Sequence, residues 1–398
     1  MSGLERTALD EKSLILVHVR ALLEQLDWAE SSLRTTGIEP RIMEAARVGF
    51  AVLFKQRRNE LTRMQASIAK GAIQADAWKQ LRTFRRSCAE LFKECLEFLG
   101  GAMLRAAHKK DDICEIADAL LIELSRNTPI QWKGVTLLAE ANFFTETTGL
   151  IRLPFPDYGI WNLPIAVHEL GHFIGPRIPD GMGGFPFQAL QQNVPASLSV
   201  KGVEQEKSHL RELFSDLFAT YALGPAYACS CILLRFDPQD ATACEDSETH
   251  PSHAKRVHFI LKALDQMSKT TEGWPYANMI DHLQALWDRI LTRAGHEKCL
   301  DEKKIPPLNY QLFELYPILA KFVPTVQYDG WDRAVALSNE LSLGRKPAAL
   351  LQAEDTIADV LNAAWLWRLR QNVENSNTVH QVNLEAIALC REVIGVGR

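Results

Sequence analysis

The chain has 398 residues, of which 47% are apolar and 23% charged, and a net charge of −5. This composition is ordinary for a globular protein, and at about 150 residues per domain the length suggests two or three domains. Residues 47–110 hold 14 Lys and Arg against 5 Asp and Glu, so this segment carries +9 and the rest of the chain −14. No nucleic-acid motif accompanies the basic segment. We therefore expect a solvated helix face or a surface for an acidic protein partner, and no binding of nucleic acid.

Eight cysteines are scattered without a CxxC pair, which is typical of reduced intracellular proteins rather than of a disulfide framework. The first residues mix charges and lack the apolar core of a signal peptide, so a cytoplasmic location is expected. The 18 residues from Leu217 to Leu234 carry no charge, which is borderline for a membrane span. Gly224 and Pro225 interrupt them, so we expect a buried helix and no membrane span.

Helical periodicity dominates the first third of the chain. Residues 14–26 carry an apolar stripe at helical spacing that includes Leu14 and Val17, and similar patterns recur at 41–70, 75–98 and 111–125. Residues 135–144 and 147–155 are instead rich in β-branched and aromatic side chains, with Gly149 between them. They predict two strands of a small antiparallel sheet, and the second strand would pair with an extended substrate at its edge.

Two helices that carry motifs are predicted next, over 162–174 and 204–223, with a loop over 175–203 that is long enough for a lid. An acidic loop at 237–249 follows. Further helices are predicted over 251–268, 276–294, 309–322, 331–342, 347–371 and 383–394. The predicted fold is mainly α with one small antiparallel sheet (α+β). We expect a helical N-terminal region at 1–127, a core with the candidate site at 128–270 and a helical C-terminal region at 271–398.

The first predicted motif helix contains H-E-x-x-H, with His168, Glu169 and His172. Residues four apart share a helix face, so both imidazoles can bind one zinc ion. Glu169 then lies beside the metal, where a general base for a zinc-bound water belongs. The pentapeptide alone also fits a surface helix with two solvated histidines.

A zinc site with two histidines needs a third ligand and keeps a fourth position open for water. Forty positions after His172, Glu212 and Asp216 lie four apart on the second motif helix. Glu212 is the candidate third ligand, and Asp216 is expected to accept an N–H from a ligand histidine, which fixes its tautomer. His209 lacks such an acidic partner and is expected at the surface. Tyr221 falls on the opposite side of the helix and is expected in the core.

H-E-x-x-H followed by E-x-x-x-D on a later helix resembles the gluzincin metallopeptidases, the thermolysin-like clan. The matching motifs cover about 162–175 and 209–224. The resemblance implies thermolysin-like active-site helices with added helical regions. It also implies Zn²⁺ as cofactor, Glu169 as base, Asp216 beside a ligand, and three metal ligands: His168, His172 and Glu212.

Thr249, His250 and Pro251, with Arg256 six residues after the histidine, look like a turn of the heat-shock and prenyl-protein-processing branch of gluzincins. There, such a His and Arg lie near the metal. Either residue would then hold the oxyanion, or His250 would occupy the fourth zinc position in a resting state. The alternative is that His250 and Pro251 only begin the next helix. That branch usually carries transmembrane helices, from which this sequence departs.

The sequence therefore predicts a selective intracellular zinc peptidase, in which Glu169 assists the attack of a zinc-bound water on a peptide bond of a protein or peptide substrate. The N-terminal helical region would select targets or hold the enzyme shut. Two alternatives stay open: a metal-stabilised interaction or regulatory protein with a latent or structural zinc site, and a hydrolase of another amide bond. A structural site has no use for Glu169. Closure of the fourth position by His250 would favour the first alternative.

Overall fold

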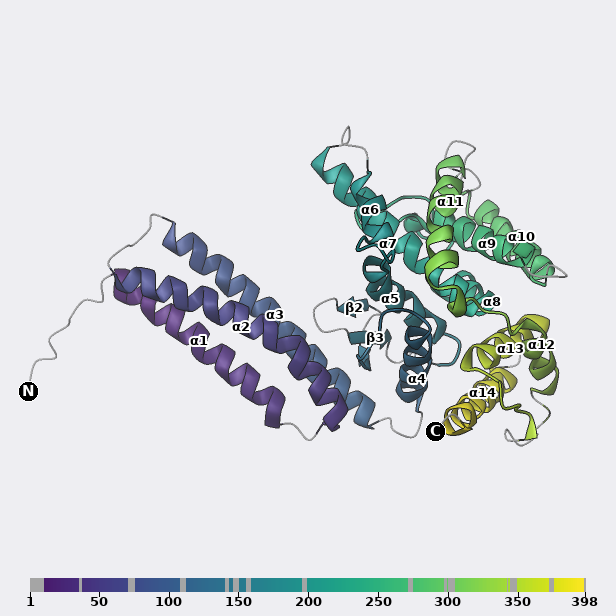
Figure 1. Cartoon of the computed structure of the whole chain (residues 1–398), viewed down its shortest axis with the longest axis horizontal. Helices are drawn as coiled ribbons and strands as arrows, with labels where there is room; N and C mark the ends of the chain where they lie inside the picture. The colour runs from purple at the N-terminus through teal and green to yellow at the C-terminus, as the bar shows by residue number, and fades with distance from the viewer. Residues whose placement is uncertain are drawn as a thin grey trace, which may run out of the picture. The chain divides into compact units, whose positions relative to one another are not determined.

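The chain is mainly helical, as predicted, and its residues form two compact units (Figure 1). The N-terminal unit comprises residues 1–109, 137–139 and 145–150, and the C-terminal unit comprises the others. The predicted division into three regions stays a prediction. The computed structural model describes residues 11–35, 38–70, 76–107, 112–139, 143–145, 150–154, 159–194, 199–270, 275–296, 299, 305–341, 343, 349–371 and 376–396.

Three long helices that pack on one another build the N-terminal unit: α1 (Glu11–Thr35), α2 (Pro40–Ala69) and α3 (Ala77–Ala107). Their core is apolar and aromatic, and the rings of Phe50 and Phe98 meet edge to face at 5.8 Å. The predicted stripe of α1 is confirmed at Val19, Leu22 and Leu26, which are buried. Leu14 and Val17 instead face solvent.

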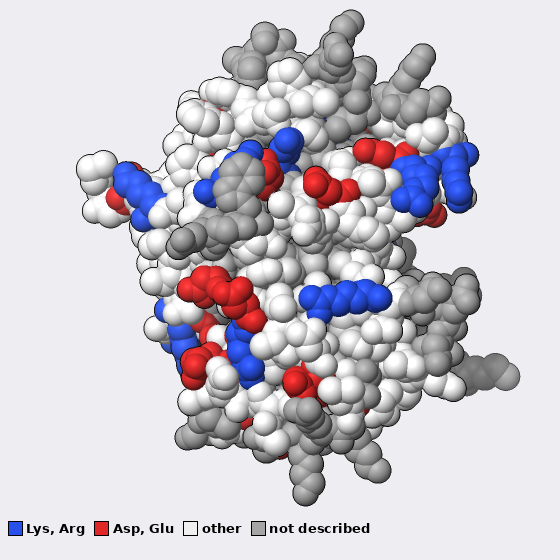
Figure 2. All heavy atoms as spheres, turned by 90° about the vertical axis from the view of Figure 1, so that its right-hand side faces the viewer, with Lys and Arg blue, Asp and Glu red and all other residues white. Residues whose placement is uncertain are grey.

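The basic segment of this unit is partly neutralised by its own acids. Arg58 pairs with Asp27 and Glu30 of α1, at 2.7 and 2.8 Å. Arg57 and Glu60 form a further pair along α2. These contacts favour a solvated helix face. Figure 2 shows a face of the C-terminal unit, on which the coloured Lys and Arg side chains lie interspersed with Asp and Glu in small groups.

Three short strands form the sheet, in the order β1 (Thr136–Ala139), β3 (Leu150–Pro154), β2 (Phe143–Thr145). Two of these strands pair in parallel, so the predicted antiparallel sheet is wrong. The prediction assumed that the two apolar runs form a hairpin. Instead β2 intervenes in sequence between the neighbours β1 and β3, which are then joined by a crossover. Because β3 is central, the predicted edge for a substrate is also wrong. Gly149 lies outside the described residues.

Most helices of the C-terminal unit lie close to the predicted positions, but α13 begins ten residues after its predicted start at 347 and α14 seven residues before its predicted start at 383. They are α4 (Ile113–Arg126), α5 (Pro164–Ile174), α6 (Pro186–Gln192), α7 (Val200–Leu223), α8 (Pro225–Ser230), α9 (His253–Thr270), α10 (Ala277–Arg293), α11 (Ile305–Phe322), α12 (Trp331–Glu340), α13 (Ile357–Arg370) and α14 (Ser376–Val396). The predicted lid segment contains α6. Ser199 begins α7 by accepting a hydrogen bond from the N–H of Gly202, which satisfies one free donor of the first turn.

The uncharged stretch 217–234 is divided among α7, α8 and a short π-helical turn (Cys231–Arg235). Gly224 separates α7 from α8 with φ +55° and ψ −136°, a conformation that only glycine adopts readily. The buried amide of Asn362 on α13 bridges this break, donating to the carbonyl of Leu223 and accepting from the N–H of Ala226. Within the described parts of the chain, no helix is both long and apolar enough to cross a membrane.

Two cysteines depart from the expectation of free thiols. Cys244, in the loop before α9, and Cys299, after α10, form a disulfide. They are 55 residues apart in sequence, and no pattern marks them as partners. The other six cysteines are free and buried.

The two motif helices, α5 and α7, cross where Gly171 faces Ser215. A Cβ atom on Gly171 would lie 2.8 Å from the Cα of Ser215, closer than carbon atoms approach without displacement. A second glycine, Gly175, meets the ring of Phe214 in the same way. The absence of side chains at these positions therefore lets the backbones of α5 and α7 approach closely.

We expect Gly171→Val to destabilise the C-terminal unit by about 2 kcal/mol, because α5 and α7 must separate to admit the side chain. The measurement is urea unfolding followed by circular dichroism. The matched control is Gly395→Ala in α14, where a Cβ atom meets nothing within 4 Å. Equal stability of the two variants would contradict the importance of the crossing.

Candidate metal centre

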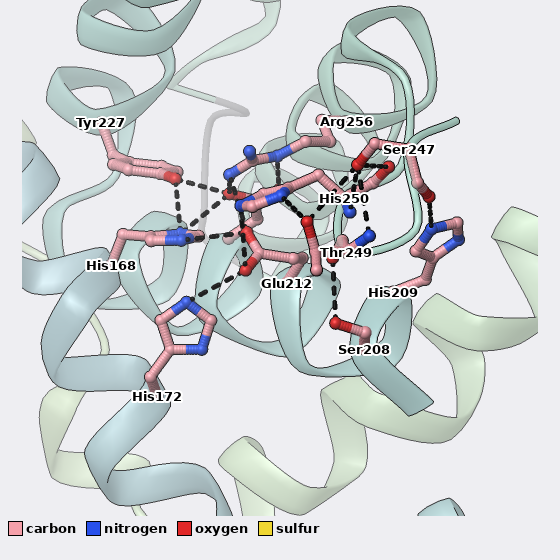
Figure 3. A network of polar contacts seen from close by, with 11 residues as sticks. His168, His172, Ser208, His209, Glu212, Tyr227, Ser247, Thr249, His250 and Arg256 are labelled. Atoms are coloured by element: carbon pink, nitrogen blue, oxygen red, sulfur yellow. Dashed lines mark hydrogen bonds and ion pairs between the residues drawn. The ribbon is translucent and has the colours of Figure 1, made fainter. Parts of the chain in front are cut away.

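Three side chains of the metal-binding kind converge where α5 crosses α7 (Figure 3). His168 and His172 project from α5, and Glu212 projects from α7. Each offers one ligand atom, and these atoms all lie within 4.8 Å of one another. His168 and Glu212 are buried, whereas the side chain of His172 is 20% exposed. The site is therefore formed within the helix pair and reaches the surface at His172.

Two nitrogen-to-oxygen distances in this group are close to those between ligands of a tetrahedral zinc ion, although each imidazole faces a different oxygen of Glu212. Nε2 of His168 lies 3.4 Å from Oε2 of Glu212, and Nε2 of His172 lies 3.3 Å from Oε1. Two ligand atoms that are each about 2.1 Å from a tetrahedral ion lie about 3.4 Å apart. The buried Oε2 of Glu212 also accepts no hydrogen bond within the described structure. Nη2 of Arg256 lies 3.6 Å from this oxygen, which is an ion pair but not a hydrogen bond, and a bound cation would satisfy the oxygen more closely.

A buried network behind the site fixes the ring of His168. Its Nδ1 lies 3.0 Å from Oδ1 of Asp216 and 3.0 Å from the hydroxyl of Tyr227. Tyr227 donates its hydroxyl hydrogen to the same Asp216 oxygen at 2.5 Å, so its own oxygen is left to accept. This arrangement places the ring proton of His168 on Nδ1. It leaves Nε2 with a free lone pair that is directed at Glu212, as metal binding requires.

Asp216 is fully buried, and Arg256 of α9 neutralises it with two hydrogen bonds, from Nε at 2.8 Å and Nη2 at 2.7 Å. Burial alone would raise the pKa of Asp216, but the charge and hydrogen bonds of Arg256, with those of His168, hold it well below the ordinary range. For the same reasons the pKa of Glu212 is lowered despite its burial, by His168, His172 and Arg256. Both carboxylates are therefore ionised at neutral pH.

The predicted base Glu169 follows His168 on α5 and is 4% exposed. Its carboxylate is thus withdrawn from bulk solvent. The two predicted oxyanion donors, His250 and Arg256, make different contacts. His250 brings Nε2 to 3.4 Å from Oε1 of Glu212, beside the candidate ligands. Arg256 directs two of its nitrogens at Asp216, which favours a positioning role for it, and its Nη2 also lies 3.6 Å from Oε2 of Glu212.

His250 belongs to a tight turn that is tied to α7 (Figure 3). Ser247 accepts the backbone N–H of His250 at 2.8 Å, and Thr249 contacts its Nδ1 at 2.8 Å. From α7, Ser208 donates to the carbonyl of Thr249, and the ring of His209 contacts the carbonyl of Ser247 at 2.9 Å. Burial lowers the pKa of His250 in spite of the nearby carboxylate of Glu212, so its ring is neutral at neutral pH.

Sequence reasoning missed two contributors to the site. His209 is 6% exposed and anchors the turn of His250, whereas a surface position was expected. Tyr227 belongs to the uncharged stretch and to no motif, and only the reversal at Gly224 brings α8 back to Asp216. The expected core position of Tyr221 is confirmed, since it is buried and packs edge to face on Tyr316.

No protein-family model matches this sequence, and comparisons with curated proteins and with solved structures found no match either. The resemblance of the motifs to gluzincins is therefore an argument from these residues alone. The geometry of the site carries the functional argument that follows.

We expect Arg256→Met to lower the free energy of unfolding by about 3 kcal/mol, because it leaves the buried charge of Asp216 without its partner. The measurement is urea unfolding in the presence of a chelator, so that metal binding does not contribute. Arg211→Met, at an exposed position on α7, is the control and should change the free energy by less than about 0.5 kcal/mol. The double variant Asp216→Asn/Arg256→Met should lose less than the sum of its single variants. If the loss of free energy of unfolding in the double variant equals the sum of the two single losses, Asp216 and Arg256 are not coupled.

Proposed function

We propose that this chain is a zinc peptidase whose ligands are His168, His172 and Glu212 and whose general base is Glu169. The observation that carries the proposal is the set of three ligand atoms within 4.8 Å of one another, with a buried glutamate directly after one ligand. A site that only stabilises the fold needs the ligands but not the glutamate. The tautomer set at His168 by Asp216 and Tyr227 adds support.

A zinc ion in this site would supply an acidified water and a Lewis acid for the carbonyl of the substrate. Glu169 accepts the proton of the attacking water and passes it to the nitrogen of the leaving amine. Asp216 and Tyr227 hold the ring of His168 in its orientation during this step, and Arg256 keeps Asp216 ionised. His250 is neutral and near the open side of the site, where it donates a hydrogen bond to the developing oxyanion.

The substrate in this proposal is a peptide bond of a protein or peptide, and the protein acts in the cytoplasm. The basic helices of the N-terminal unit are a candidate surface for an acidic protein partner. Arg82 and Arg86 are exposed on α3, and among the described contacts of these two residues none is an ion pair. They are the first positions to test for such a partner.

A second candidate function is a latent or regulatory zinc protein, and one distance favours it. Nε2 of His250 is as far from Glu212 as the ligand nitrogens are, at 3.4 Å. Its ring would then complete a four-ligand site and exclude water. The two proposals therefore differ in the role of His250, which is an oxyanion donor in the first and a fourth zinc ligand in the second.

Glu169→Gln should lower cleavage of a casein-like substrate by at least about 100-fold, because the amide cannot accept a proton. Zinc content, measured by mass spectrometry, should stay at one equivalent at this site, since Glu169 is not a ligand. Glu206→Gln, at an exposed position on α7, is the matched control and should retain activity. His168→Ala should lose both this zinc and cleavage. Full activity of the Glu169 variant would refute the proposed mechanism, and a wild-type chain without zinc at this site would refute the metal centre.

His250→Ala separates the two proposals. If His250 holds the oxyanion, cleavage should fall about 100-fold while zinc affinity is unchanged. If it closes the site, cleavage should rise and zinc affinity should fall. The measurement is the rate of cleavage alongside competition for zinc with a chromophoric chelator. Thr249→Ala, which removes the contact with Nδ1 of His250 and a longer contact with the hydroxyl of Ser247, should give a smaller change in the same direction.

A further inference from the structure

A second group of metal-binding side chains lies in the C-terminal unit, formed by Cys244, His296 and Cys299. Each offers one ligand atom, and the three atoms lie within 4.8 Å of one another. In the structure the two sulfur atoms form a disulfide. Two thiolates and one imidazole are, however, also the donor set of many zinc sites.

The backbone fixes the position of His296. It follows Gly295, which ends α10 with φ +74°. The N–H of Gly295 donates to the carbonyl of Thr292, and the N–H of His296 donates to that of Leu291. This is the Schellman pattern of helix termination, and it satisfies carbonyls that α10 leaves free. The N–H of Cys299 then donates to the carbonyl of His296 at 3.0 Å, so a turn brings both side chains together.

The ring of His296 is also oriented. Its Nδ1 lies 3.2 Å from the carbonyl oxygen of Pro238, which accepts only if that nitrogen carries the proton. This leaves Nε2 as the nitrogen with a free lone pair. A ligand histidine that donates its other N–H to a backbone carbonyl is the usual arrangement around a bound metal.

The state of the other cysteines argues that Cys244 and Cys299 do not belong to a disulfide-stabilised fold. Six of the eight are free and buried, in both units of the chain. A disulfide framework would leave few free thiols, whereas a Cys and His cluster in a chain of free thiols is typical of a metal site. Cys244 and His296 are half-buried, so an ion can enter, and Cys299 is buried.

We propose that in the reduced chain Cys244, His296 and Cys299 bind a second zinc ion, separate from His168, His172 and Glu212. Binding releases the two thiol protons, and the fourth position is left to water. The site would fasten the loop before α9 to the end of α10. That loop also carries His250, so the second ion would hold in place the turn beside the first site. The proposal does not depend on peptidase activity.

The test uses the full-length His168→Ala variant, which lacks the first site, with Co²⁺ as the probe. A phosphine first reduces the disulfide: with one water it yields two thiols and the phosphine oxide. Titration with Co²⁺ should then produce a thiolate-to-metal charge-transfer band in the near ultraviolet that saturates at one equivalent. Zn²⁺ should displace the band.

In the same background, Cys244→Ser and Cys299→Ser should abolish the band, and His296→Gln should weaken Co²⁺ binding at least tenfold. Cys95→Ser, in α3, is the matched control and should leave the band unchanged. Circular dichroism checks that each variant folds, and Cys244 is the more tolerant position because it is only half-buried. A folded Cys244→Ser chain that keeps the band would overturn the proposal. A disulfide that resists the phosphine, or reduced thiols that give no band, would also overturn it and leave a structural disulfide.

Discussion

The buried carboxylate of Asp216 is the constraint on which the candidate site depends. A charge with no exposure to water is tolerated only where opposite charge and hydrogen bonds replace its hydration. Arg256 supplies the charge, and Tyr227 and His168 supply further contacts. These partners come from α9, α8 and α5, while Asp216 itself belongs to α7. One side chain thus determines how four helices meet and which nitrogen of His168 is free.

The close approach of α5 and α7 is the second requirement. Gly171 stands between the two ligand histidines, on the face that meets Ser215. With a side chain there, the helices would stand further apart, and Glu212 could not reach both imidazoles at 3.3 to 3.4 Å. Gly171 is the second x of the H-E-x-x-H motif, a position at which metal binding requires no particular residue. The close packing of α5 against α7 requires glycine there.

The turn of His250 connects the two candidate metal sites. One side of it is tied to α7 by Ser208 and His209, next to Glu212. The loop that leads to it is fastened at Cys244 to the end of α10. Whether the fastening is a disulfide or a metal ion, it restricts the segment that places His250. In the proposed function, the position of this imidazole decides whether the first site is open or closed to water.

The sequence by itself determined the long helices and the central residues of the site. Helical periodicity is local, and two histidines four residues apart face the same side of any α-helix. It did not determine the direction of the sheet, because strand pairing depends on which segments meet in space, and β2 takes the far side of β3. Only the tertiary structure decided the partners of the ligands. Tyr227 reaches Asp216 because Gly224 reverses the chain, Arg256 arrives from α9, and Cys244 meets Cys299 across 55 residues. Such contacts follow from how helices pack against one another, and neither the spacing nor the type of these residues encodes that packing locally.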